Sequence, residues 1–158
     1  MNFKNLIYSL ACLSFSVVIG AAIYEHLAVV PQWAAGPPAS LSMFQGDYGL
    51  YPQAFWIPVH PITLALLLLA LIISWKSQRR TNVITTLIGY VAILVITFIY
   101  FVPELIAITT TPYSDTVDAA LTERAEKWEM LSLVRLGFLM LLSLILFMGL
   151  TRSNNKRY

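Results

Sequence analysis

The sequence contains little charge, and this shortage limits what the protein can be. Asp, Glu, Lys and Arg make up 11% of the 158 residues, whereas a soluble domain of this size carries about 25%. Hydrophobic residues make up 58% of the chain, and the mean hydropathy is +0.73. So much apolar surface needs lipid around it, so the lipid bilayer is the expected partner. Because no basic stripe is present, nucleic acid is not expected to bind.

Cysteine is nearly absent, which excludes a second class of protein. Cys12 is the only cysteine and lies within an apolar run. The chain therefore contains neither an internal disulfide nor a Cys-x-x-Cys pair, and a membrane thiol–disulfide oxidoreductase needs paired thiols. We interpret Cys12 as a small packing residue.

Four long apolar runs dominate what the sequence does contain, at residues 6–30, 56–75, 83–102 and 130–150. Each is close to the roughly 20 residues that a helix needs to cross a bilayer. Continuous runs of this length predict helices and not barrel strands. We therefore predict an all-α fold, an integral membrane four-helix bundle that forms one domain over residues 1–158. The first run could also be a cleaved signal peptide, but its length and the following Glu25-His26 pair favour a retained helix.

The charges are distributed unevenly around these runs, which predicts their direction. Basic residues flank one set of run ends, at Lys4, Lys76, Arg79, Arg80, Arg152, Lys156 and Arg157. All acidic residues fall at the opposite ends, at Glu25, Asp47, Glu104, Asp115, Asp118, Glu123, Glu126 and Glu129. Because positively charged segments stay in the cytoplasm, we predict a multi-pass protein of the cell membrane with both termini cytoplasmic.

Two long connections are expected on the outer side. Residues 31–57 contain four prolines, three glycines and six aromatic residues, so they should not form one helix. They predict either an aromatic belt at the membrane interface or a lid over a site. In the second connection, we expect Asp115 to cap a polar helix over residues 116–127.

Alternating helix directions should collect several polar residues at one membrane level near the outer face. Glu25, His26, His60 and Glu104 all lie at outer ends of predicted spans. Arg135 lies about 10 Å into the fourth span at 1.5 Å per residue. Since a cation at the centre of a span costs about 2.5–3.5 kcal/mol on insertion scales, we expect Arg135 to face the bundle interior. There it would pair with Glu25 or Glu104, or hold a carbonyl or anionic group of a substrate.

This set of residues predicts a polar site with several candidate roles. His60 would serve as general base, with Glu25 and Glu104 supplying charge and Arg135 stabilising an oxyanion. The aromatic residues expected to bind substrate are Trp128, Tyr100 and Trp56. The cofactor stays unknown: His26, His60 and Glu25 could hold iron, copper or zinc, and haem between the two histidines is a less favoured alternative.

Three short motifs resemble those of the anthrone oxygenase-like family of membrane proteins, also known as DUF1772. They are Glu25-His26 after the first helix, Phe101-Val102-Pro103-Glu104 closing the third, and Trp128 followed by Arg135 in the fourth. The four-span layout and the length are similar too. The resemblance implies an oxidoreductase, because some members of that family oxidise anthrones to anthraquinones with dioxygen.

Two functional classes therefore follow from the sequence. The first is a membrane oxygenase or oxidoreductase that acts on a small hydrophobic, aromatic or quinone-like molecule. The alternative is a non-enzymatic membrane protein that binds a lipid, haem or a partner helix in the same cavity. A small multidrug exporter is disfavoured because every acidic residue lies at an outer helix end.

Overall fold

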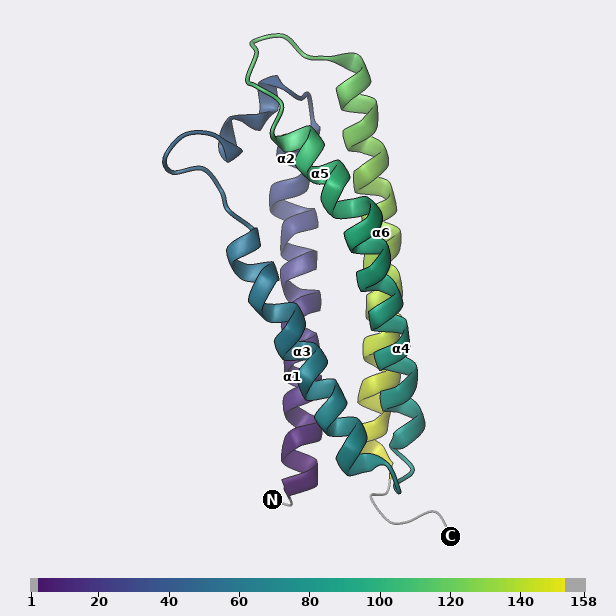
Figure 1. Ribbon diagram of the computed structural model, residues 1–158. Coiled ribbons are helices and arrows are strands. Elements are labelled where there is room, and N and C mark those ends of the chain that lie inside the picture. The colour runs from purple at the N-terminus through teal and green to yellow at the C-terminus, as the bar shows by residue number, and fades with distance from the viewer. Residues whose placement is uncertain (1–2, 153–158) are drawn as a thin grey trace. The chain divides into compact units, whose positions relative to one another are not determined.

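The computed structural model describes residues 3–152, and four long helical segments account for most of them. These segments are Phe3–Ala34, Gln53–Ser74, Arg80–Thr109 and Ala119–Thr151, and each is long and apolar enough to cross a membrane (Figure 1). The all-α fold and the four predicted runs are confirmed at this level. The helical segments extend beyond most of the apolar runs, because the backbone stays helical in the polar flanks.

Two of the four segments are not regular α-helices. The first consists of α1 (Phe3–Tyr24), a π-helical turn (Glu25–Val29) and α2 (Val30–Ala34). The third consists of α4 (Arg80–Ile96), a π-helical turn (Thr97–Phe101) and α5 (Val102–Thr109). The remaining elements are a 3-10 helix (Ala39–Phe44), α3 (Gln53–Ser74), α6 (Ala119–Met148) and a final 3-10 turn (Gly149–Thr151).

Both π-helical turns are followed by the same dipeptide, Val-Pro. The turn at Glu25–Val29 precedes Val30-Pro31, and the turn at Thr97–Phe101 precedes Val102-Pro103. Proline has no N–H, and its ring clashes with the carbonyl one turn earlier. The backbone widens before each proline, so that Val30 N–H donates to the Glu25 carbonyl and Val102 N–H to the Thr97 carbonyl.

The chain forms two compact units. The first unit comprises Met1–Gly20, Gln53–Ala92 and Gly137–Tyr158, and the second comprises Ala21–Pro52 and Ile93–Leu136. All eight acidic residues belong to the second unit, and seven of the ten basic residues belong to the first. The charge asymmetry of the sequence therefore coincides with a division of the structure.

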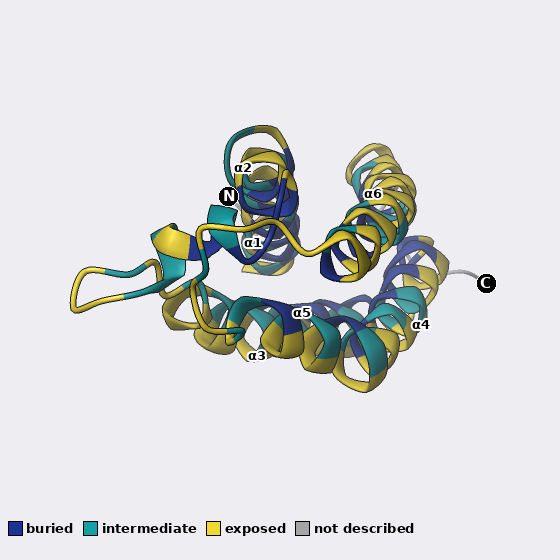
Figure 2. Ribbon diagram, turned by 90° about the horizontal axis from the view of Figure 1, so that it is seen from above, coloured by how far each residue is buried: buried dark blue, intermediate teal, exposed yellow. Residues whose placement is uncertain are grey.

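The first unit is held by hydrogen bonds from side chains to the backbone of α6. Tyr8 Oη donates to the Leu146 carbonyl at 2.7 Å, and Asn82 Nδ2 donates to the Ile145 carbonyl at 2.6 Å. Arg79 is buried, stacks over the Tyr8 ring and donates to Asn5 and to the Arg152 carbonyl. Exposed residues run along one side of α3 and α4 (Figure 2), as expected for helices that face lipid.

The second unit has an aromatic core. Trp33 packs edge-to-face against Trp128 with ring centroids 5.4 Å apart, and Phe101 packs likewise against Trp128 at 5.9 Å. The apolar residues buried around these rings are Val30, Ala34, Leu41, Ile108, Leu121 and Ala125. The core brings α2, the 3-10 helix and α5 together with the first half of α6.

The two connections differ in part from expectation. Residues 31–57 do not form one helix, as predicted, but Pro31 is accommodated inside the first helical segment, and α3 begins already at Gln53. The predicted cap at Asp115 is wrong: α6 begins at Ala119, and Asp118 Oδ1 accepts from the N–H groups of Ala120 and Leu121. Asp115 accepts instead from the Tyr113 hydroxyl at 2.7 Å.

The close approach of Gly149 to Tyr8 gives a prediction for the first unit. A Cβ at Gly149 would collide with the Tyr8 hydroxyl, which is bonded to the Leu146 carbonyl. We expect Gly149→Ala to lower the free energy of unfolding by about 1–3 kcal/mol, the range for overpacking a core. The measurement is reversible unfolding of the purified protein in mixed micelles. Gly137→Ala is the control: no atom lies within 4 Å of its Cβ position, so equal losses in both variants would contradict this packing.

Candidate functional site

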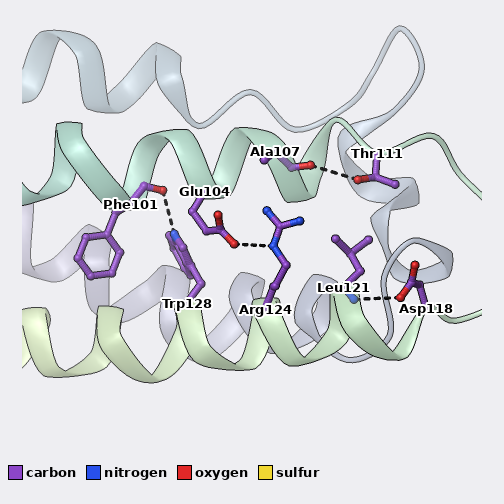
Figure 3. Close-up of polar contacts among 8 residues, drawn as sticks. All are labelled: Phe101, Glu104, Ala107, Thr111, Asp118, Leu121, Arg124 and Trp128. Carbon is purple, nitrogen blue, oxygen red and sulfur yellow. Dashed lines mark hydrogen bonds and ion pairs between the residues drawn. The ribbon is translucent and has the colours of Figure 1, made fainter.

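In the second unit, the third helical segment and α6 are joined by a ladder of polar contacts. Arg124 Nε donates to Glu104 Oε1 at 2.8 Å, and Trp128 Nε1 donates to the Phe101 carbonyl at 2.9 Å (Figure 3). Further along, Arg135 Nη1 donates to Thr97 Oγ1 at 3.0 Å. Along this ladder the residue numbers of the third segment fall from 104 to 97 while those of α6 rise from 124 to 135. The two segments therefore run antiparallel in a fixed register.

Arg135 has neutral hydrogen-bond partners in this ladder. Besides Thr97, it donates from Nη2 to Ser132 Oγ at 2.7 Å. Its guanidinium carbon lies 4.1 Å from the centre of the Phe101 ring, a distance typical of a cation–π contact. Within residues 3–152, these are two hydrogen bonds for a group with five N–H donors. Five donors exceed these two bonds, and Glu25 also acts on the guanidinium electrostatically.

The register decides which carboxylate Arg135 can meet. Glu104 lies seven residues beyond Thr97, about 10 Å along a helix, and it is bonded to Arg124. The predicted pairing of Arg135 with Glu104 is therefore wrong. The alternative partner, Glu25, interacts electrostatically with Arg135, and their pairing stays a prediction.

The two π-helical turns supply the groups that act on Arg135. Glu25 is the first residue of one turn and Thr97 the first residue of the other, and Phe101 ends the second turn. Residues in π-helical turns often belong to functional sites. The irregular backbone before each Val-Pro pair therefore coincides with the polar surroundings of Arg135.

His26 belongs to the same unit and has an unusual environment. Its side chain is buried, and its Nδ1 donates to the Ala22 carbonyl at 2.8 Å. Its Nε2 is buried without a hydrogen-bond partner. Leaving a buried acceptor unsatisfied costs about 1–3 kcal/mol. The ring is thus held by its Nδ1–H, and its buried Nε2 has no hydrogen-bond partner among residues 3–152.

His60 belongs to the first unit, where it forms part of a hydrogen-bonded chain. Its Nδ1 lies 2.7 Å from the Tyr90 hydroxyl, and Tyr90 is hydrogen-bonded to Thr63. Thr63 in turn lies 2.7 Å from Ser14 Oγ. The Trp56 ring stacks on the imidazole at 5.3 Å with an interplanar angle of 21°. This chain holds the imidazole in one orientation, as a general base requires.

The structure thus groups some predicted site residues and not others. In the second unit, Arg135 is hydrogen-bonded to Thr97 and interacts electrostatically with Glu25. In the first unit, the Trp56 ring stacks on His60. Among residues 3–152, no three His, Cys, Asp or Glu side chains form a group that could hold a metal ion. The metal set His26, His60 and Glu25 and the haem alternative thus gain no support.

The predicted aromatic binding residues have packing roles. Trp128 is buried, and its N–H is bonded to the Phe101 carbonyl. Tyr100 is half-buried and packs edge-to-face against Phe101 at 5.1 Å. The sequence reasoning missed Arg124, although it lies four residues before Trp128 on the helix face that also carries Ser132 and Arg135. Continuing that face by one more turn would have identified it.

Comparisons with known proteins add no assignment. No family model, no curated protein and no solved structure matches the chain.

The two hydroxyl partners of Arg135 give a prediction about stability. Thr97 Oγ1 also donates to the Ile93 carbonyl at 2.8 Å, so it keeps a partner when the guanidinium is removed. We expect Arg135→Leu to leave the free energy of unfolding unchanged or to raise it by up to about 3 kcal/mol, since a cation within a span is costly. The measurement is reversible unfolding in mixed micelles.

Arg79→Leu is the matched control for this prediction. Arg79 is buried with Asn5, the Arg152 carbonyl and the Tyr8 ring as partners. Its removal should cost about 1–3 kcal/mol because buried acceptors lose their donor. If Arg135→Leu destabilised the protein as much as Arg79→Leu, Arg135 would have a structural role instead.

Proposed function

We propose that this protein is a multi-pass membrane protein whose second unit binds a small hydrophobic molecule through Arg135. The bound molecule would be aromatic or quinone-like and would present a carbonyl or anionic oxygen to the guanidinium. The observation that carries this proposal is that the Arg135 guanidinium donates two hydrogen bonds to hydroxyls and lies over an aromatic ring. A guanidinium has five N–H donors and can therefore bind a further oxygen. A cation is costly within a span, and a ligand oxygen would complete its hydrogen bonds.

Two further features support a ligand of this kind. The buried Nε2 of His26 lacks a donor, and a hydroxyl on the ligand or a water molecule could provide one. The core of the unit contains Trp33, Phe101 and Trp128 in edge-to-face contact, and such rings favour aromatic partners. Glu25 would balance the charge of Arg135, whereas Glu104 is bonded to Arg124 and has no part in the proposed site.

We also propose the orientation that the basic residues imply. With Lys76, Arg79 and Arg80 in the cytoplasm, both termini would be cytoplasmic, and the second unit would lie towards the outer face. The acidic residues, which all belong to the second unit, support this orientation. The site around Arg135 would then be reached from the outer leaflet.

Ligand binding can be tested with a quinone probe. We expect the protein in nanodiscs to bind 1,4-naphthoquinone at least about tenfold more tightly than naphthalene, because hydrogen bonds from a charged group contribute about 1.5–3 kcal/mol. Arg135→Gln should abolish this preference, as measured by the quenching of tryptophan fluorescence. Arg124→Gln removes a cation from the exposed end of the same ladder and serves as the control. Equal loss in both variants, or no preference in the unmodified protein, would exclude the proposed site.

The hydrogen-bonded chain at His60 favours a second candidate function, an oxidoreductase. When His60 Nδ1–H donates to the Tyr90 oxygen, the lone pair lies on the other ring nitrogen of His60. It could remove a proton from the acidic C–H group of an anthrone. The resulting carbanion reacts with dioxygen, and overall one anthrone and one dioxygen give one anthraquinone and one water. The resemblance to anthrone oxygenase-like proteins supports the same reaction.

Oxygen uptake with anthrone tests this second candidate. General base catalysis contributes about 10²–10⁴-fold to a rate, so His60→Gln should reduce the enzyme-dependent rate by about 10²-fold or more. Tyr90→Phe removes the hydroxyl that holds the imidazole and should reduce it by about tenfold. Tyr48→Phe, at a fully exposed tyrosine, should have no effect. If no uptake above the spontaneous rate occurs, or if the Tyr48 variant loses as much, this candidate is excluded.

A further inference from the structure

The loop between the 3-10 helix and α3, residues 46–51, exposes aromatic and apolar side chains that neither candidate function uses. Tyr48 is 100% exposed, Tyr51 is 67% exposed and Leu50 is 47% exposed. The loop extends away from α2, α5 and the first half of α6, and most of its length is exposed (Figure 1, Figure 2). Such a group of exposed apolar side chains indicates contact with another surface.

The backbone of this loop closes on itself and presents Tyr48. Leu50 N–H donates to the Met43 carbonyl at 2.7 Å, and Gly49 N–H donates to the Gly46 carbonyl at 3.2 Å. The second of these bonds closes a β-turn that has Tyr48 at one of its two central positions. Gly46 has a φ of 77°, which glycine adopts without steric cost. The turn therefore places Tyr48 at the tip of the loop.

The segment before the loop is fixed in the aromatic core of the second unit. Phe44 packs edge-to-face against Trp33 with ring centroids 6.2 Å apart, and Leu41 is fully buried in the same core. The aromatic residues of this connection thus form two sets. Trp33 and Phe44 pack inside the protein, whereas the tyrosines of the loop are exposed.

The chain after the loop limits how far the loop can lie from a membrane. α3 begins at Gln53 and has 22 residues. Its length of about 33 Å matches the roughly 30 Å of hydrocarbon in a bilayer, so Gln53 would lie at the edge of the hydrocarbon layer. An extended chain spans at most about 3.6 Å per residue, so Tyr51 lies within about 7 Å of Gln53 and Tyr48 within about 18 Å. The loop can therefore reach the head groups whatever its detailed path.

The composition of the loop fits the head-group region better than either water or hydrocarbon. Tyrosine combines an apolar ring with a polar hydroxyl and is enriched at membrane–water interfaces. Leu50 would gain from leaving water. Asp47, the only charged residue of the loop, would need the polar surroundings that head groups offer and hydrocarbon lacks.

We propose that residues 46–51 lie in the head-group region of the bilayer beside the start of α3, with Tyr48, Leu50 and Tyr51 directed towards the acyl chains. The partner of this surface is thus a lipid layer. Because the 3-10 helix is packed into the aromatic core, the loop would hold that core at the membrane surface. The proposal rests on α3 crossing the membrane, but not on a ligand of Arg135 or on catalysis by His60.

Spin labels in the full-length protein, reconstituted into phosphatidylcholine liposomes, test this location. Cys12 is the only cysteine, so a Cys12→Ala background allows single labels at Tyr48→Cys, Leu50→Cys and Ile62→Cys. Depth follows from collisions with oxygen, which concentrates in lipid, and with a nickel chelate, which stays in water. Lipids labelled at the head group and along the acyl chain calibrate the scale. We expect the labels at positions 48 and 50 in the head-group layer, which is about 5–8 Å thick, and the label at position 62 in hydrocarbon.

Two sets of substitutions test whether the tyrosines hold the loop there. With the label at position 50, Tyr48→Ser combined with Tyr51→Ser should move it outward by about 5 Å or more, into water. Tyr113→Ser is the matched control, because Tyr113 is a 51% exposed tyrosine of the other long connection, and it should leave the label in place. The thermal unfolding midpoint of each variant checks that it has folded.

Three results would overturn the proposed location. They are a label at position 48 in water beyond the head groups, a label shielded from both reagents as in a contact with protein, and equal displacement by Tyr113→Ser and the double variant. A label at position 62 in water would contradict the membrane span of α3 itself, which separates failure of the span from failure of the loop's location.

Discussion

The hydrogen bonding of the backbone is the constraint on which the rest of this structure depends. In a bilayer, an N–H or C=O group without a partner inside the protein has none, so a membrane-spanning chain must be helical. Pro31 and Pro103 break this pattern in two of the four segments, because neither can donate to the preceding turn. The chain responds each time with a π-helical turn, closed by Val30 N–H on the Glu25 carbonyl and by Val102 N–H on the Thr97 carbonyl.

The polar site of the second unit follows from these two irregular turns. Glu25 and Thr97 occupy the same position, the first residue of a π-helical turn, and both act on Arg135. Because proline has no N–H, a carbonyl one turn before it loses its helical partner. In a membrane, polar side chains can supply that partner. The feature that makes these helices imperfect as membrane spans therefore coincides with the place where a buried cation is tolerated.

The sequence was sufficient to predict four long apolar helices because hydropathy averaged over about 20 residues does not depend on local hydrogen bonding. It also placed Arg135 well inside the apolar part of α6, since this position requires only the rise per residue. The π-helical turns were not predicted because an apolar run does not show which N–H bonds to which carbonyl. Both Val-Pro pairs that follow these turns are present in the sequence. Sequence reasoning predicted the wrong partner for Glu104 for a related reason. The rise per residue predicts how far each residue lies from a helix end, but only the antiparallel register shows that Glu104 meets Arg124 and not Arg135.

Arg79 and Arg135 show why the candidate site is assigned to the second unit. Both cations are buried at least in part, but Arg79 donates to a side-chain amide and a backbone carbonyl and stacks on Tyr8. Arg135 has two hydroxyls, Phe101 and the electrostatic influence of Glu25, and one of these hydroxyls keeps its own partner without it. A cation that contributes so little to packing at such a cost is expected to serve binding, because an added ligand oxygen would turn its spare N–H groups into charge-assisted hydrogen bonds.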